Sequence, residues 1–486
     1  MFRPNYEDVI MKTQETDIKH IEDLYAEAHE HQINTGDVKI HAKRMGGTFR
    51  NLKWLSTLVW IIFFIGPYLR WGDRQAVLLD IPNRQFHIFN ITLLPQDLWM
   101  LSFVLLFFAI LLAVVTAVAG RVWCGYFCFQ TVWTDVFTWI EEKLEGNPAK
   151  RRKLDKAKMD FNKFKLRSTK YTLWLLIALL TGISFVAWFT DAYQLWVDLF
   201  TFNASQTAYI VIGAFIAGTF YLAGFLREQA CFWLCPYARI QAVMIDNTTI
   251  VPSYDVPRGE KRGRLFKGKA TSEEQGDCID CNQCVAVCPT GVDIRGGQQE
   301  GCIMCALCID ACDQVMDKIK KPRGLIRYAS WDEIMGKEEK ALYKRPRVWV
   351  YSAILLVSVL GVVLGLSGMR ALELKVLHSR QPLFVLQSDG SIQNKFTLKV
   401  LNKRPEDMQV NISVVDSQFK DLKILGAEKA IVAKHGTVTP VTIYVRVPRK
   451  HLQEESQPIT FNVTGKDSSG TEYSSDRESV FIGPKR

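Results

Sequence analysis

Histidine is scarce in this sequence, and none of its eight histidines falls within a long apolar run. This lack excludes a haem held by two histidines inside a bilayer as the electron carrier of the chain. Cysteine is absent from everything after Cys312, so no disulfide can stabilise that part. The first fifty residues are polar and lead into no short apolar segment with a small-residue cleavage site. We therefore expect no cleaved signal peptide.

Charge is missing from five stretches of the chain, and this lack is the first positive signal. A helix that spans a bilayer needs about 20 apolar residues, within a range of roughly 17–25. Four of the five stretches reach that length, and the first can extend into its flanks. Helices buried in a soluble core are the alternative, but five such stretches in one chain favour a membrane protein. The stretches are Trp54–Leu69, Leu98–Gly120, Tyr171–Thr190, Leu199–Leu226 and Val348–Met369.

The connecting segments predict the orientation. Residues 121–170 carry twelve Lys and Arg and residues 227–346 carry eighteen, whereas residues 191–207 carry none. Because basic loops stay in the cytoplasm, the N-terminus should be cytoplasmic and everything after Met369 periplasmic. The basic run at 150–170 could bind nucleic acid, but a topology signal that faces anionic lipid explains it better. We therefore expect membrane lipid, and no nucleic acid, as a partner.

The most specific motif is CIDCNQCVAVCPTG, which begins at Cys278 and is followed twenty-four residues later by CIMCALCIDAC. Each is the cysteine run of bacterial ferredoxins, in which three cysteines hold one [4Fe–4S] cluster and the fourth reaches the other cluster. Zinc is the alternative, but tetrahedral zinc prefers separated ligand pairs. Asp313 stands where a proline usually follows the second run, and we expect it to loosen one turn without removing a ligand. The predicted ligands are Cys278, Cys281, Cys284 and Cys312 for the first cluster, and Cys302, Cys305, Cys308 and Cys288 for the second.

Two further cysteine pairs follow apolar runs with one offset of 107 residues: Cys124 and Cys128, then Cys231 and Cys235. The match predicts a parallel repeat of two membrane hairpins, each ending in a pair. Residues four apart on a helix share a face, with Cβ atoms about 5–6 Å apart, so each pair should clamp one ion from a single helix. Soft thiolates favour Cu(I) but also suit zinc or an iron–sulfur cluster. Cysteine is also a comfortable small apolar residue in such helices. We predict a redox or metal role, with the metal left open.

Three other segments have weaker patterns. Residues 15–32 have the spacing of an amphipathic helix. GRLFKGKA, at 263–270, nearly matches a phosphate-binding loop, but Ala270 replaces the hydroxyl that would hold Mg²⁺ and no strand precedes it, so we interpret it as a basic linker. From about residue 375 onward, segments such as VTIYVRV alternate apolar and polar residues between Gly, Pro, Asp and Asn. This alternation predicts a β-sandwich of about 100 residues.

Together these features resemble the FixG/RdxA/CcoG family of cytochrome c oxidase accessory proteins. The resemblance covers nearly the whole chain, including CFWLCP at the second pair and DIPNRQFHIF between the first two spans. The first pair, in CGYFCF, lacks that proline, so the two pairs need not have equal roles. The resemblance implies a multi-domain membrane protein with an α-helical transmembrane bundle of about five spans, a cytoplasmic bacterial-type 2[4Fe–4S] ferredoxin domain and a C-terminal all-β immunoglobulin-like periplasmic domain. The expected parts are a cytoplasmic segment (1–53), a membrane domain with two hairpin repeats (54–245), the ferredoxin-like domain (246–346), a fifth transmembrane helix (347–369) and the periplasmic domain (370–486).

The resemblance also implies a function. It places the protein in the inner membrane of a Gram-negative bacterium, where it would reduce Cu(II) to Cu(I) during assembly of a cbb3-type cytochrome c oxidase. Two [4Fe–4S] clusters would then pass electrons from an unidentified cytoplasmic donor to copper, and assembly factors or copper carriers would be the partners. The copper and redox site would be Cys124, Cys128, Cys231 and Cys235.

Two other functions stay open. One is an electron relay between quinol and a periplasmic reductase, which a quinone pocket between the spans would favour. The other is a redox sensor or assembly scaffold without enzymatic activity, which full clusters without copper turnover would favour.

Overall fold

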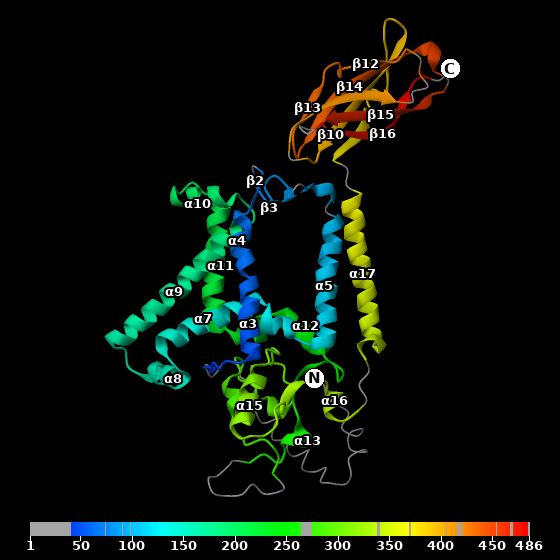
Figure 1. Ribbon diagram of the computed structural model, residues 1–486. Helices are drawn as coiled ribbons and strands as arrows, with labels where there is room; N and C mark the ends of the chain where they lie inside the picture. Colours follow the sequence, from blue (N-terminus) through cyan, green and yellow to red (C-terminus); the bar gives the residue numbers. More distant parts are fainter. Residues whose placement is uncertain are drawn as a thin grey trace. The chain divides into compact units, whose positions relative to one another are not determined.

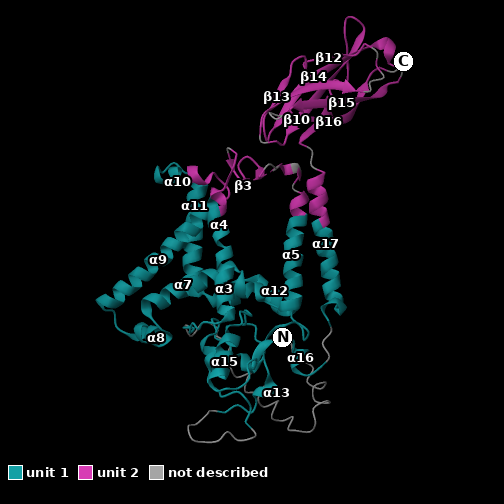
Figure 2. Ribbon diagram, in the orientation of Figure 1, with its two compact units in different colours: residues 1–65, 103–187, 196–359 teal, residues 66–102, 188–195, 360–486 magenta. Residues whose placement is uncertain are grey.

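The computed structural model describes residues 40–484 apart from short gaps, and it divides into two compact units (Figure 1, Figure 2). The first unit comprises residues 1–65, 103–187 and 196–359, and the second comprises 66–102, 188–195 and 360–486. The helix expected at 15–32 and most of the linker at 263–270 lie outside the described residues. The gaps are residues 73, 90, 98, 264–274, 338–340, 369–370, 405, 416–418, 420, 453 and 467–469.

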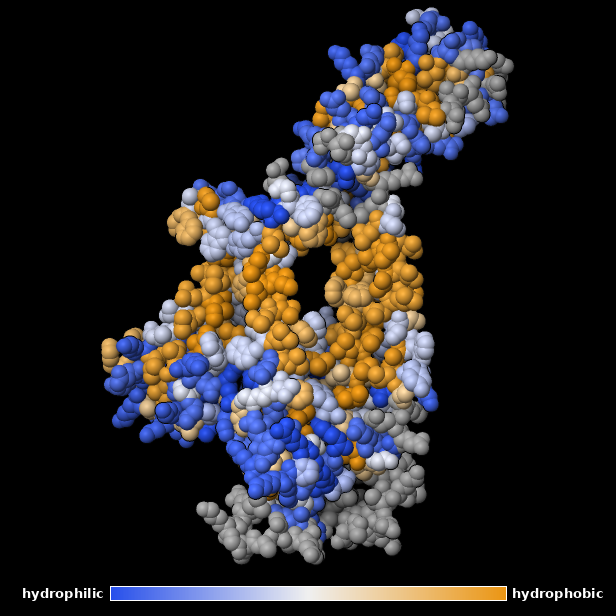
Figure 3. Space-filling view, viewed as in Figure 1, coloured by the Kyte–Doolittle hydropathy of each residue, from blue (hydrophilic) through white to orange (hydrophobic). Residues whose placement is uncertain are grey.

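Five helical stretches in the described part of the chain are long and apolar enough to cross a bilayer. Large apolar side chains such as Leu105, Phe108 and Leu364 are more than half exposed on them. Lipid covers such a surface far better than water does, and Figure 3 shows large areas of hydrophobic surface on the molecule. These helices indicate a membrane protein, and the number that span the bilayer stays a prediction. The stretches are Thr48–Tyr68 (α3, Thr48–Val59; α4, Ile61–Ile65; η1, Gly66–Tyr68), α5 (Trp99–Ala119), α9 (Phe161–Val186), Gln206–Leu226 (α11, Gln206–Tyr221; η3, Leu222–Leu226) and α17 (Pro346–Ser367).

Three of these stretches have clearly different limits from those that the sequence predicted. The third begins at Phe161 rather than Tyr171. The first begins earlier, at Thr48, because Arg50 and Lys53 are buried in ion pairs with Asp135 rather than left to solvent. The fourth begins later, because the side chain of Ser205 accepts a hydrogen bond from the N–H of Ala208 and so caps α11. The residues before that cap form a separate short helix, α10 (Ala192–Phe200).

The two hairpins of the first unit end in the same order of elements. After α5 come α6 (Val122–Tyr126) and α7 (Phe129–Glu145), and after η3 come η4 (Ala230–Leu234) and α12 (Pro236–Met244). In both hairpins a short helical turn carries the first cysteine, and the second cysteine precedes the next helix. This is the order expected of a parallel repeat. In the first hairpin α8 (Pro148–Lys156) follows α7.

Residues 251–329, which contain both ferredoxin cysteine runs and are called the iron–sulfur segment below, are closed by their own small sheet. Strand β6 (Val251–Tyr254) pairs antiparallel with β7 (Ile326–Ala329), so the two ends of the segment meet. In Figure 1 the segment lies at the end of the helices where α5 and α11 finish and where α3 and α17 begin. The enclosed helices are α13 (Val256–Gly259), α14 (Gln283–Ala286), η5 (Ile294–Gly296) and α15 (Leu307–Lys318), and α16 (Trp331–Ile334) and η6 (Leu342–Lys344) follow.

The second unit contains the C-terminal sandwich that the alternating pattern predicted. One sheet has the order β12-β14-β10-β8, with β9 beside β10, and the other has the order β13-β11-β15-β16. Phe396, Ile443 and Phe461 pack between them, fully buried. The prediction of a β-sandwich is thus confirmed. The sandwich strands are β8 (Leu372–His378), β9 (Val385–Leu386), β10 (Ser391–Asn402), β11 (Met408–Val415), β12 (Lys423–Leu425), β13 (Ile431–Ala433), β14 (Val438–Pro448), β15 (Ser456–Lys466) and β16 (Glu472–Ile482), with η7 (Arg449–His451) between β14 and β15. The unit also holds the short strands β1 (Arg70–Trp71), β2 (Arg74–Gln75), β3 (Val77–Asp80), β4 (Gln85–Ile88) and β5 (Ile91–Leu93), and η2 (Pro95–Asp97).

Candidate iron–sulfur and thiol site

The first cysteine run forms a loop around a small cavity. Cys281 lies at its exposed tip, between Asp280 and Asn282, whose backbones are left-handed at φ 50° and 55°. Such a conformation is uncommon outside glycine, and two of them turn the chain tightly around one cysteine. The cavity is lined by the four cysteines that the spacing assigns to the first cluster: Cys278, Cys281, Cys284 and Cys312.

The second run repeats this geometry. Met304 and Ala306 are left-handed at φ 56° and 57° on either side of Cys305. Burial, with smaller contributions from the neighbouring Cys288 and Cys305, raises the pKa of Cys302 to about 12. Burial likewise raises the pKa of Cys308, with contributions from the same cysteines. The structure therefore brings the second predicted set together as well, including Cys288 from the first run.

These residues fit two [4Fe–4S] clusters. All the donors are sulfur, and burial raises the pKa values of Cys284 and Cys312 to about 12. Deprotonating a buried thiol that lies beside other cysteines is unfavourable. Bound iron removes this penalty, because it supplies the compensating positive charge. When bound, such clusters supply one-electron carriers. The assignment of individual ligands to each cluster stays a prediction.

Asp313 does not loosen a turn. The helix α15 continues through it to Lys318, and its carboxylate accepts a hydrogen bond of 3.0 Å from the N–H of Gly324. A proline at this position would break the helix. The expectation of a looser turn is therefore wrong, because the second run leads into a long helix rather than a bend.

The two membrane pairs do not lie on single helices. Cys124 is in α6, but Cys128 has extended backbone (φ −62°, ψ 128°) and stands before α7. Cys231 is in η4, and Cys235 is likewise extended (φ −85°, ψ 110°) before Pro236. The expected clamp of two thiols on one helical face is therefore wrong, because each helix ends before the second cysteine of its pair.

The structure nevertheless brings these four cysteines into one neighbourhood. Burial raises the pKa of Cys231 to about 12, with further contributions from Cys128 and Cys124. Burial also raises the pKa of Cys124, to which Cys128 and Cys235 add, while Arg121 lowers it. Within the described part of the chain, no three His, Cys, Asp or Glu side chains are arranged to hold a single metal ion. The four thiols therefore form a loose group contributed by both hairpins.

A buried amide fixes one of these thiols. The Cys124 thiol donates a hydrogen bond of 2.9 Å to Oε1 of Gln241, which lies on α12 in the other hairpin. The amide nitrogen of Gln241 donates in turn to Thr116 Oγ1 at 3.2 Å. Hydrogen bonds that orient a ligand adjust its chemistry as well as its position. Sequence reasoning missed Gln241, because only the fold brings its helix to Cys124.

The first pair packs directly on the second cysteine run. Cys124 shares a buried cluster with Ile303 and Cys305, and the hydroxyl of Tyr126 donates to the carbonyl of Cys305 at 3.0 Å. Gly125 is needed here, since a Cβ at this position would lie 2.6 Å from the carbonyl oxygen of Ile303. The membrane thiols and the predicted second cluster are therefore neighbours.

A carboxylate between two predicted ligands holds the first span. Asp310 accepts hydrogen bonds from the N–H groups of Phe49 at 3.2 Å and Arg50 at 2.9 Å, in the first turn of α3. The residue at the N-cap of that helix is Gly47, which has no capping side chain. A Cβ there would lie 2.2 Å from Cγ of Asp310. No local sequence signal identifies this cap, because it comes from a distant part of the chain.

Three family models match the chain. A 4Fe-4S dicluster domain matches residues 226–331, which include the second thiol pair and both cysteine runs. A 4Fe-4S binding domain matches residues 101–148, which include the first pair. The model described as an IG-like fold at the C-terminal of FixG matches residues 362–484.

Curated relatives match over most of their length. The nitrogen fixation protein FixG of Rhizobium meliloti is 37% identical over 478 residues, which cover 89% of this chain and 91% of that protein. Protein RdxB of Cereibacter sphaeroides is 44% identical over 407 residues, which cover 81% and 85%. Protein RdxA of the same organism is 40% identical over 389 residues, which cover 77% and 82%. With its two ferredoxin cysteine runs, apolar helices and C-terminal IG-like domain, this chain belongs to the FixG/RdxA family of iron–sulfur electron-transfer proteins.

Proposed function

We propose that this protein reduces Cu(II) to Cu(I) at Cys124, Cys128, Cys231 and Cys235, and that it does so during assembly of a cbb3-type cytochrome c oxidase in a Gram-negative inner membrane. The observation that supports it most is the packing of Cys124 against Ile303 and Cys305. Because the Cys124 thiol contacts the loop of the predicted second cluster, an electron could pass from that cluster to the thiol through directly packed residues. Oxidase assembly factors or copper carriers would be the partners.

The exposure of the cysteines suggests a direction for the electron. Cys281 is exposed at the tip of the first run, whereas Cys305 of the second run is buried against Cys124. We therefore infer that a reduced one-electron carrier protein of the cytoplasm docks at Cys281 and that the electron leaves near Cys305. The donor loses one electron and Cu(II) gains it, and no bond to hydrogen is made or broken. Thiolate sulfur stabilises the Cu(I) product over Cu(II).

The test is single-turnover reduction of Cu(II) by the pre-reduced, anaerobically purified protein, followed with a Cu(I)-specific chelator. We expect the double variants Cys124→Ala/Cys128→Ala and Cys231→Ala/Cys235→Ala to keep their iron and to lose copper reduction. Met45→Leu is the control, because Met45 places a sulfur against the same buried cluster without a thiol. Wild-type rates in both double variants would show that the thiols are packing residues and that copper is reduced elsewhere, if at all.

A second candidate function uses the same cysteines. The match of residues 101–148, which include the first pair, to a 4Fe-4S binding domain favours a third [4Fe–4S] cluster in an electron relay. Iron and copper counts per chain separate the two functions. Iron for two clusters together with bound copper supports the copper site, and iron for three clusters without copper supports the relay.

A further inference from the structure

A cavity at the cysteine-bearing end of the first unit is lined mainly by residues outside the electron path proposed above. It lies between the segment that leads into α3, the helices α7 and α8, and the turn after η3, with Cys231 and Thr290 on its wall. Its volume is about 60 Å³. A buried water needs roughly 10–15 Å³ by this measure, so the cavity has room for a few waters or for one oxyanion of phosphate size. Five basic residues line it: Arg44, Arg50, Lys53, Arg151 and Arg227.

Four of these five cations are almost completely buried. Arg50, Lys53, Arg151 and Arg227 are 7%, 3%, 1% and 5% exposed. Burying a positive charge is strongly unfavourable unless an anion and hydrogen bonds compensate it. The partners of these side chains therefore decide whether the cavity is neutral.

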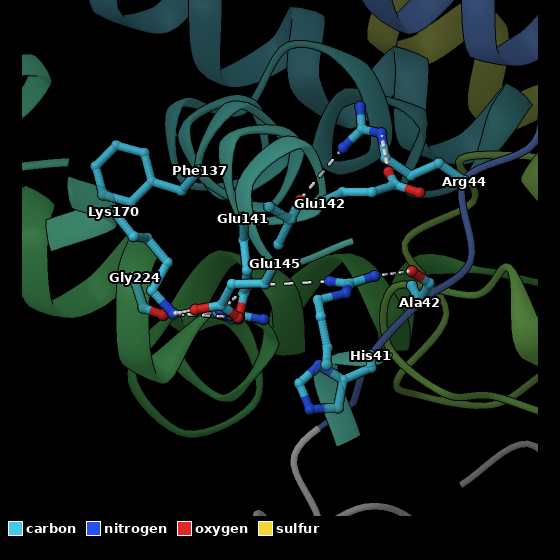
Figure 4. A network of polar contacts seen from close by, with 12 residues as sticks. His41, Ala42, Arg44, Phe137, Glu141, Glu142, Glu145, Lys170 and Gly224 are labelled. Carbon is cyan, nitrogen blue, oxygen red and sulfur yellow. Dashed lines mark hydrogen bonds and ion pairs between the residues drawn. The ribbon is translucent and has the colours of Figure 1, made fainter. Parts of the chain in front are cut away.

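Carboxylates of α7 compensate the cations only in part. Asp135 is shared by Arg50 at 3.0 Å, Arg44 at 3.1 Å and Lys53 at 3.9 Å. Glu141 is shared by Arg227 at 2.6 Å and Arg151 at 4.0 Å, and Figure 4 shows how Glu141, Glu142 and Glu145 face the basic side chains. The ion pairs form two separate groups: three Lys and Arg share two carboxylates, and four Lys and Arg share three, so each group has an excess of one positive charge. The cations are Arg44, Arg50, Lys53, Arg151, Arg167, Lys170 and Arg227, and the carboxylates are Asp135, Glu141, Glu142, Glu145 and Asp155.

The one other carboxyl on the wall, Glu228, can offset only one of these two charges. Burial raises the pKa of Glu228, and the neighbouring Arg227 lowers it. Burial alone would raise the pKa of Asp135, but Lys53, Arg50 and Arg44 lower it to about 2. The negative charge of Asp135 is therefore already paired with these three cations.

Three guanidinium nitrogens of the wall lack a hydrogen-bond partner among the described residues. They are Nη2 of Arg44, Nε of Arg50 and Nε of Arg151, all buried. A buried charged donor without an acceptor is strongly unfavourable. An anion with several oxygen atoms would accept hydrogen bonds from these donors and would also compensate the excess positive charge of the cavity.

We propose that this cavity binds a phosphate group through Arg44, Arg50 and Arg151. Arginine presents forked donors that match the oxygens of a phosphate. The group has two sources, the headgroup of an anionic phospholipid and free inorganic phosphate. Lys53 lies near the start of the first apolar helical stretch, Thr48–Tyr68, and Arg227 directly follows the fourth, so the cavity lies at the end of these stretches, where headgroups are found. This inference does not depend on copper reduction.

The test measures thermal unfolding of the full-length protein, purified anaerobically and stripped of lipid in detergent. Inorganic phosphate is titrated against chloride of equal ionic strength, and the protein is separately placed in phosphatidylcholine nanodiscs with or without phosphatidylglycerol. An increase in unfolding temperature with phosphate indicates the free anion, and an increase only with phosphatidylglycerol indicates the lipid headgroup. No increase in either arm would overturn the proposal.

Two variants tie the effect to the cavity. Arg151→Gln should weaken the response about tenfold or more, because it removes one charged, buried partner of the anion. Arg152→Gln is the matched control, since Arg152 is exposed one residue away on α8 and should respond as the wild type does. Thr134→Glu places a carboxylate on the wall and should abolish the response while iron content stays unchanged. A wild-type response in both Arg151→Gln and Thr134→Glu would show that the anion binds elsewhere.

Discussion

Replacing Asp310 with alanine should loosen the first span from the iron–sulfur segment. The buried carboxylate accepts the N–H groups of Phe49 at 3.2 Å and Arg50 at 2.9 Å. Loss of an N-cap costs about 0.5–2 kcal/mol, and a buried N–H without a partner costs about 1–3 kcal/mol. These two contributions overlap, so we expect Asp310→Ala to lower the free energy of unfolding by about 2–3 kcal/mol. Asp310→Asn should lower the free energy of unfolding by only about 0.3–1 kcal/mol. It keeps an oxygen acceptor and loses only the negative charge beside the positive end of the helix.

Thermal unfolding of the full chain in detergent, at one scan rate and with iron counted, measures this effect. Gly47→Ala should resemble Asp310→Ala, because the added Cβ would lie 2.2 Å from Cγ of Asp310. Asp317→Ala is the control on the same helix, since Asp317 is exposed in a pair with Arg323 and should unfold as the wild type does. Equal unfolding temperatures for Asp310→Ala and the wild type, with full iron content, would refute the reasoning. Loss of iron from Asp310→Ala would instead show that the carboxylate supports the cluster loop.

Three other predictions concern the ligands, the thiols and the orientation. Cys284→Ser should lose iron and cluster absorption, and unchanged values of both would contradict the proposed ligand set. Gln241→Leu removes the acceptor of the Cys124 thiol and should change the affinity for Cu(I) without changing iron content, whereas an unchanged affinity would show that the hydrogen bond has no role at the site. Reporters fused after residues 150 and 260 should be cytoplasmic and those after 200 and 380 periplasmic, and a cytoplasmic C-terminus would overturn the five-span topology.

Features with local causes could be predicted from the sequence. Absence of charge over about 20 residues marked the five apolar helices, and alternation of apolar and polar residues predicted the sandwich. The spacing within each cysteine run also anticipated which side chains meet in the first cavity, because three of its four cysteines lie within a few residues of one another.

Features that depend on distant partners could not be predicted. The first span begins among basic residues because Asp135, 85 residues beyond Arg50, forms ion pairs with Arg50 and Lys53. Gln241 reaches Cys124 across 117 residues. The clamp expected at each membrane pair failed for another reason: spacing of four residues predicts a shared face only if the helix continues, and extended backbone at Cys128 and Cys235 ends it.

The contact between the first thiol pair and the second cysteine run also sets an order of events during synthesis. Tyr126 and Cys305 are 179 residues apart, and a ribosome that adds about 5–20 residues per second needs roughly 10–40 s to cover that distance. Cys124 and Cys128 lack the second pair until Cys231 and Cys235 have been synthesised, 107 residues later, and they lack the second cysteine run through the whole interval. The contact between Tyr126 and Cys305 therefore cannot form until both cysteine-bearing segments have been synthesised, and before that the first pair stands without the partners that the fold brings to it.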